Sequence, residues 1–121
     1  MNRNAAAAAV TAVLMVTLSY PSLSSAHLVS RSECVEGSQF IMDGALARDH
    51  GVPRETYIGQ LLGDIETIKA FPVELRWFVQ DDEDAALLVS AAKEVYDDPA
   101  PPEKHRQAFL SRCLGRPTTN S

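Results

Sequence analysis

Two cysteines, Cys34 and Cys113, lie near opposite ends of the charged part of this 121-residue chain, and the chain has no others. An even pair of cysteines is most simply a disulfide, provided that the protein works in an oxidising compartment. Such a bond would force the first and last parts of the fold to lie side by side. The pair therefore limits the possible folds more than any other feature of the sequence.

The first 26 residues predict export to such a compartment. Arg3 is the only charged residue among them, and an unbroken apolar or small stretch follows at positions 5–18. This length is typical of a signal-peptide hydrophobic region and short for a membrane span. Ser24-Ser25-Ala26 supplies the small residues that signal peptidase accepts, so we expect cleavage after Ala26 and a mature protein in the periplasm.

The remaining segment, residues 27–121, is expected to form a single small domain with an ordered core at about 32–115. Loss of Arg3 with the signal peptide changes the formal net charge from −5 to −6. This charge argues against nucleic acid or an anionic membrane as a partner, because both require a basic face. No second apolar run is long enough to span a membrane.

Apolar residues at three- and four-residue spacing predict a first helix from about Ser32 to His50, with Ser32 as its N-cap. Gly51 is expected to take the left-handed conformation that ends a helix. A second helix begins at Pro53 and ends before Phe71, which precedes a proline. Gly59 and Gly63 each weaken this helix by about 1 kcal/mol relative to alanine, and Gly63 is a possible break.

Two further helices are predicted in the second half. Asp81–Asp84 begins a third helix, which ends at Asp97-Asp98-Pro99. Pro101 and Pro102 begin a fourth, which ends at Gly115. Residues 118–121 are expected to form a frayed tail. The segment at 73–79 alternates like a strand but has no partner strand, so we interpret it as a short helix or an extended connector that buries Trp77.

Both cysteines fall on the apolar faces of their predicted helices. We therefore predict an all-α bundle of four helices in which a Cys34–Cys113 disulfide joins the first helix to the last. Closing so long a loop removes about 4–5 kcal/mol of unfolded-state entropy in the chain-entropy model. A reactive or metal-binding thiol pair is disfavoured, because the sequence has no C-x-x-C and no adjacent histidine to lower a thiol pKa.

Metal binding has two weak candidates. Cleavage after Ala26 would make His27 the N-terminal residue, whose amine and imidazole could chelate copper with help from His50 or His105. The known histidine-brace copper proteins are β-sandwiches, so a metal-free N-terminal histidine is the favoured interpretation. The acids at 81–84 lack the alternation, central glycine and distal glutamate of a calcium loop, and a solvated helix start is favoured.

Catalysis has no specific support in the sequence. There is no glycine-rich phosphate loop, no H-E-x-x-H and no G-x-S-x-G, and we expect no cofactor. His50 is interpreted as a helix-capping residue. His105 is expected on a solvated face of the fourth helix, and Arg48-Asp49 is interpreted as helix surface.

Three segments resemble those of a group of small exported proteobacterial proteins that have two cysteines and a helical layout. They are Arg48-Asp49-His50-Gly51-Val52-Pro53, Val95-Tyr96-Asp97-Asp98-Pro99, and the final helix from Phe109 to Cys113 with Cys34 upstream. The resemblance implies a Gram-negative periplasm and supplies no catalytic residue. More distantly, the size, export and single disulfide are similar to periplasmic immunity proteins that block peptidoglycan-degrading effectors, and to acid-activated periplasmic chaperones.

We therefore expect a non-catalytic module that binds another protein, with an acidic surface suited to a basic partner. The predicted contact residues are Trp77, Phe78, Asp81, Asp82, Glu83 and Asp84, the aromatic pair only if exposed. An immunity or inhibitor protein and an acid-stress chaperone are the main alternatives. A small enzyme and a copper protein are the least favoured.

Overall fold

The computed structural model describes residues 28–119. The predicted signal peptide, its cleavage site after Ala26 and the copper candidate His27 lie outside the described residues. No helix within 28–119 is long and apolar enough to cross a membrane.

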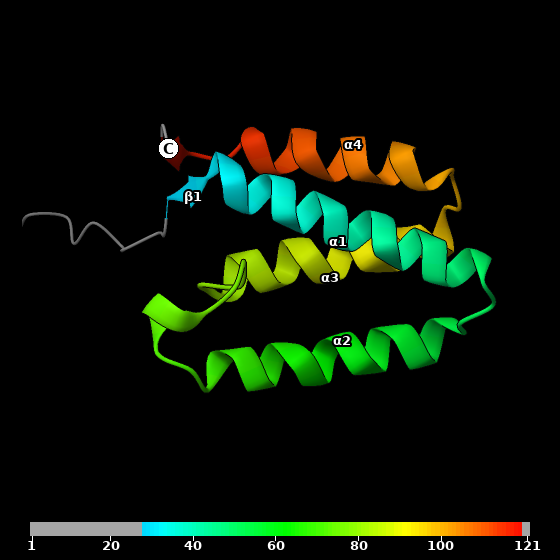
Figure 1. The fold of residues 1–121 in the computed structure, drawn as a ribbon, viewed down its shortest axis with the longest axis horizontal. Coiled ribbons are helices and arrows are strands. Elements are labelled where there is room, and N and C mark those ends of the chain that lie inside the picture. The colour runs from blue at the N-terminus through cyan, green and yellow to red at the C-terminus, as the bar shows by residue number, and fades with distance from the viewer. Residues whose placement is uncertain (1–27, 120–121) are drawn as a thin grey trace, which may run out of the picture.

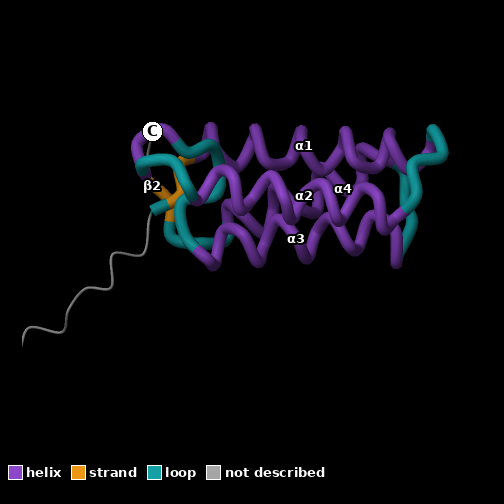
Figure 2. The backbone as a smooth tube through the Cα atoms, turned by 90° about the horizontal axis from the view of Figure 1, so that it is seen from below, coloured by secondary structure: helices purple, strands orange, loops and turns teal. Residues whose placement is uncertain are grey.

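Four helices form the bundle, and they lie nearly side by side along one long axis (Figure 1). They are α1 (Arg31–Asp49), α2 (Arg54–Lys69), α3 (Asp82–Asp97) and α4 (Pro102–Leu114). Helix α1 packs most extensively against α4 and also against α3, while α2 packs against α3. The predicted all-α, four-helix fold is confirmed. Figure 2 shows the strands and the C-terminal end of the chain at one end of the bundle, opposite the α1–α2 and α3–α4 turns.

The C-terminal end of α1 agrees with the sequence prediction, and its N-terminal end does not. Ser30, not the predicted Ser32, is the N-cap, and its hydroxyl accepts the Glu33 backbone N–H at 3.1 Å. At the other end Gly51 has φ of +93°, as predicted. The backbone N–H of Val52 then reaches the carbonyl of Ala47 at 3.0 Å, which completes a Schellman motif.

Helix α2 runs through Gly63 without a break, so the possible split at this glycine does not occur. The segment that follows it forms a short 3₁₀ helix, η1 (Val73–Leu75), and then an extended connector. The prediction left open a short helix or an extended connector, and the segment contains both. Its fully buried residues are Phe78 and Val79, at 1% and 0% exposure, whereas Trp77 is only half-buried. The prediction that the connector buries Trp77 was therefore wrong: the connector residues that are fully buried are Phe78 and Val79.

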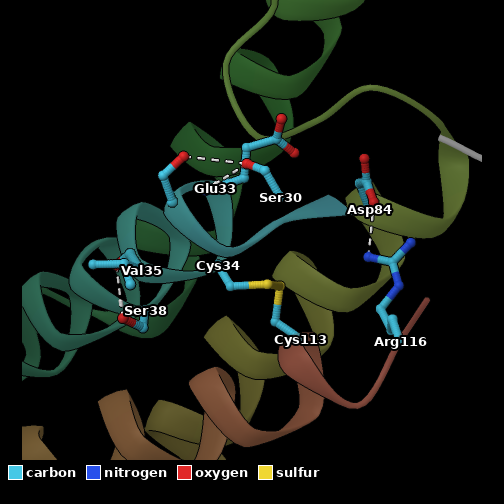
Figure 3. The surroundings of a disulfide bond; sticks show 9 residues. Ser30, Glu33, Cys34, Val35, Ser38, Asp84, Cys113 and Arg116 are labelled. Atoms are coloured by element: carbon cyan, nitrogen blue, oxygen red, sulfur yellow. Dashed lines mark hydrogen bonds and ion pairs between the residues drawn. A yellow bond between two sulfur atoms is a disulfide. The ribbon is translucent and has the colours of Figure 1, made fainter. Parts of the chain in front are cut away.

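The disulfide joins Cys34 in α1 to Cys113 in α4, with the two Cα atoms 5.5 Å apart, as predicted (Figure 3). Both cysteines are fully buried in a core shared by all four helices. The bond lies at the end of the bundle where both described chain ends meet. It closes the pairing of the first and last helices.

The prediction of a frayed tail at residues 118–121 was wrong for its first two residues. Strand β2 (Thr118–Thr119) pairs in parallel with β1 (Val29–Ser30). Arg116 also reaches inward, and its Nη1 lies 2.7 Å from Oδ1 of Asp84, whose side chain is fully buried (Figure 3). Two-residue strands have no sequence pattern long enough to recognise, which explains why this pairing was missed.

Candidate functional site

An apolar groove of about 340 Å³ opens between α1, α2, α3 and the connector. Its apolar lining combines residues from each of these segments: Phe40, Leu61, Ile65, Ile68, Trp77 and Leu88. The exposed polar residues Asp64 and Thr67 complete the lining. A second depression of about 240 Å³, lined in part by Tyr57, shares Phe40, Leu61 and Asp64 with the first. The two therefore adjoin along the α1–α2 side of the bundle.

Aromatic rings connect this groove to the core. Trp77 lies 5.4 Å from Phe40 on the groove side and 5.9 Å from Phe78 on the inner side, measured between ring centroids. Phe78 continues inward to Phe109 at 5.6 Å. Tilted ring pairs at these distances stabilise their arrangement beyond simple burial. The half-buried Trp77 is thus held in a fixed position while one part of it faces the groove.

The connector carries an exposed apolar tip. Between Ile68 and Trp77, which both line the groove, Phe71, Val73 and Leu75 are 48%, 50% and 71% exposed. These three residues are called the apolar tip below. Three large apolar side chains so close together on a surface are unusual for a small soluble domain.

Arg76 fixes the shape of the connector. Its guanidinium donates to three backbone carbonyls, those of Phe71 at 2.9 Å, Lys69 at 2.9 Å and Gln80 at 3.0 Å. The Gln80 side chain donates back to the Arg76 carbonyl at 2.9 Å. Carbonyls that neither helix nor sheet can satisfy are thus paired. The role of Arg76 has no signal in the sequence, because only the folded connector brings these carbonyls together.

The four acids at the start of α3 have different roles. Asp81 caps the helix, as predicted, by accepting the Asp84 backbone N–H at 2.9 Å. Asp84 is fully buried and paired with Arg116, so it is inaccessible to a partner. Asp82 and Glu83 are exposed, with side-chain exposures of 93% and 78%. The predicted acidic contact surface is therefore reduced to two residues.

The predicted aromatic contacts also divide. Trp77 is half-buried and lines the groove, so it remains available to a partner. Phe78 is 1% exposed and belongs to the core, so it is not. Each of the two exposed acids has a basic neighbour: Lys69 Nζ lies 2.9 Å from Asp82 Oδ1, and Arg116 Nη2 lies 3.8 Å from Glu83 Oε2. The groove and its surroundings thus combine an apolar lining with accessible carboxylates.

A second cluster of polar side chains joins α1 to α3 and α4 at the opposite end of the bundle from the disulfide. Arg48 donates to the carbonyls of Val95 at 2.7 Å and Ala100 at 2.8 Å. His105 Nε2 lies 3.0 Å from the backbone nitrogen of Ala100 and 3.4 Å from Arg48 Nη1. His105 is 8% exposed, and the Arg48 side chain is 15% exposed. The predictions that His105 is solvated and that Arg48 lies on the helix surface were therefore wrong.

Other contacts at this end hold α2 against α3. Arg54 makes a bidentate pair with Asp97, at 2.8 and 3.1 Å, and this partner lowers the pKa of the Asp97 carboxyl. The Tyr96 hydroxyl donates to the Val52 carbonyl at 2.9 Å. His50 caps α1, as predicted, through its Nδ1 and the Leu46 carbonyl at 2.7 Å. Two sequence segments that the resemblance singled out, 48–53 and 95–99, thus meet in the fold.

No group of three or more His, Cys, Asp or Glu within residues 28–119 is placed to hold a metal ion. Comparison of the chain with protein-family models, with curated proteins and with solved structures finds no match. The resemblance to small exported two-cysteine proteins thus stays a prediction.

Proposed function

We propose that this protein is a non-catalytic binding module that receives an apolar segment of a basic partner protein in the groove beside Trp77. The observation that carries the proposal is a preformed apolar groove flanked by the apolar tip. Interface centres are characteristically built from such apolar and aromatic pockets, with charged residues at the rim.

Charge selects the kind of partner. Asp64 lines the groove, and Asp82 and Glu83 are exposed at the start of α3. Lys69 is paired with Asp82, and Arg76 is committed to backbone carbonyls. Asp82 and Glu83 thus already have basic neighbours, since Glu83 lies 3.8 Å from Arg116, and Asp64 is the carboxylate of the three that has no ion pair among the described residues. A cationic segment would therefore meet Asp64 at the groove and no free basic side chain among these residues. An amphipathic basic helix, with apolar residues on one face and lysine or arginine on the other, fits this arrangement.

Trp77 provides the assay, because it is the only tryptophan in the chain. The probe is a synthetic 14-residue amphipathic helical peptide of leucine and lysine, and the control peptide replaces every lysine with glutamate. We expect the lysine peptide to shift Trp77 emission to shorter wavelength in a saturable manner and the glutamate peptide to leave it unchanged. The response should weaken as salt screens the rim carboxylates.

A charge-reversal pair of variants locates the binding site. Asp64→Lys, at the groove, is expected to weaken binding of the lysine peptide by about tenfold, a typical effect of a like charge at an interface rim. Glu103→Lys makes the same change in charge at an exposed residue of α4 and should leave the affinity within about twofold. Equal losses in both variants would show attraction to overall charge, and a response to both peptides alike would show non-specific apolar adsorption. Either result contradicts the proposal.

The immunity or inhibitor hypothesis is one specific form of this module. It requires a gene for a peptidoglycan-degrading effector beside the gene for this chain, and nanomolar binding of that effector. With purified effector, photo-crosslinking from position 75 in the apolar tip should yield the complex. A crosslink formed only from α4 would place the partner elsewhere and contradict the role of the groove.

A further inference from the structure

The α3–α4 linker is held by two side chains from different helices. Ala100 is flanked by Pro99, Pro101 and Pro102, so it is the only one of residues 99–102 with a backbone N–H. That N–H lies 3.0 Å from His105 Nε2, and the Ala100 carbonyl accepts from Arg48 at 2.8 Å. Both polar backbone groups of Ala100 are thus taken up by the same two side chains.

This geometry requires a neutral imidazole. A backbone N–H only donates, so Nε2 of His105 must present its lone pair and the ring proton must lie on Nδ1. A second proton on Nε2 would remove the acceptor for Ala100. It would also place two donors, both cationic, at the 3.4 Å separation of Arg48 Nη1 and His105 Nε2.

The charges around the ring come from three segments. Burial first, and then the Arg48 charge from α1, hold the pKa of His105 below its ordinary value of 6.5, and Lys104 of α4 acts in the same direction. Asp98 and Glu94, at the end of α3, oppose this shift. Glu94 is itself paired with Arg112, at 2.8 and 3.0 Å.

The disulfide and this cluster hold opposite ends of α4. Cys113 lies in the last turn of the helix, whereas His105 lies in its first turns and Ala100 precedes it. In Figure 1 the α3–α4 turn lies at the far end of the bundle from the C-terminus. One end of α4 is therefore attached covalently, and the other is held by contacts that require a neutral histidine.

We propose that His105 and Arg48 form an acid-sensitive latch: protonation of His105 releases Ala100, and the N-terminal part of α4 then separates from α1 while the disulfide retains its C-terminal end. The opening uncovers apolar surface of α1 that α4 covers in the closed bundle. The latch is independent of the partner proposed for the groove.

The sign of the pH dependence follows from proton linkage. The closed state binds the His105 proton more weakly than the open state does, so the latch is fully effective above pH 6.5. Its contribution is lost as pH falls from 6.5 through the lowered pKa of the closed state. Within that window a single proton raises the opening equilibrium constant by up to about tenfold per pH unit.

Amide hydrogen exchange, measured by NMR between pH 7 and 4.5 on the oxidised protein and corrected for intrinsic rates, tests the proposal. We expect protection to fall with pH at Ala100 and His105, and to stay constant at Cys113. His105→Gln retains an acceptor that does not titrate, so it should abolish this fall. His50→Gln removes an exposed histidine at the end of α1 and should leave the fall unchanged.

An unchanged fall in His105→Gln, its loss in His50→Gln, or equal loss of protection along all of α4 would each overturn the latch. The wild-type ring titration of His105, followed by NMR, is an independent measurement should the variant not fold. We expect it below 6.5, and a value at or above 6.5 would exclude the mechanism. Binding of an apolar dye should rise in the same pH window, because the opening uncovers the surface that the chaperone alternative requires, and a constant signal would contradict the separation of α4 from α1.

Discussion

Alanine at Gly37 should destabilise the protein, whereas alanine at Gly63 should stabilise it. A Cβ at Gly37, in the middle of α1, would lie 2.7 and 2.9 Å from two ring atoms of Phe109 and 3.3 Å from Phe78. A Cβ at Gly63 would meet nothing within 4 Å. The same chemical change is therefore made in two helix interiors that differ only in packing.

The magnitudes follow from two opposing effects. Replacing glycine with alanine in a helix interior stabilises by about 1 kcal/mol. Overpacking a filled core costs about 1–3 kcal/mol. The Phe109 ring has no room to swing aside, because it is 1% exposed and its centroid lies 5.6 Å from that of Phe78. We expect Gly37→Ala to lose about 1 kcal/mol net and Gly63→Ala to gain about 1 kcal/mol.

Urea unfolding of the oxidised protein, followed by circular dichroism at 222 nm, measures both changes. Phe109→Leu tests the cause: the double variant Gly37→Ala/Phe109→Leu should be more stable than the sum of the single effects by about 1 kcal/mol, because the shorter side chain makes room for the methyl group. The reasoning is refuted if Gly37→Ala stabilises as much as Gly63→Ala. Additive effects in the double variant would show that Phe109 is not the obstacle.

Three further variants test the disulfide, the buried ion pair and a buried hydroxyl. Replacing Cys34 and Cys113 together with serine should cost about 4–5 kcal/mol in the chain-entropy model, seen as a lower urea midpoint; an unchanged midpoint would contradict it. Arg116→Met leaves Asp84 buried without its partner and should cost about 3 kcal/mol, and stability within about 0.5 kcal/mol of wild type would show that the pair contributes little. The hydroxyl of Tyr57 is buried without a hydrogen-bond partner among the described residues, so Tyr57→Phe should be neutral or stabilising by up to about 1 kcal/mol at pH 7. Burial raises the pKa of Tyr57 to about 12, so wild type should lose more stability than the variant as pH rises from 10 toward 12 in an alkaline unfolding series.

The helices could be predicted because their signals are local. Gly51 and Pro53 separate α1 from α2, and Pro102 begins α4, each through a backbone preference of its own residue. Gly115 ends α4 with a helical φ of −76°. The disulfide could be predicted because two local patterns placed both cysteines on apolar faces. The predicted N-cap of α1 was two residues from the observed one, since both Ser30 and Ser32 are good caps and only tertiary structure decides between them.

The polar contacts could not be predicted, because their partners are distant in the chain. Arg48 and His105 have ordinary surface-residue character, and they become buried only because Ala100 is folded between them. Asp84 had the pattern of a solvated helix start and is buried by an arginine from beyond α4. The groove depends on how far α2 stands from α1, which no residue pattern specifies.

The packing order of the helices limits when this fold can form. Because α1 packs most extensively against α4, its main partner is synthesised only after α2 and α3, and a chain that ends before residue 102 lacks that partner altogether. Contacts between distant segments form slowly, since the intervening chain must first be ordered. Helix α1 therefore remains without its principal apolar cover until α4 has been made. Removal of α4 should leave α1 exposed rather than produce a smaller stable domain.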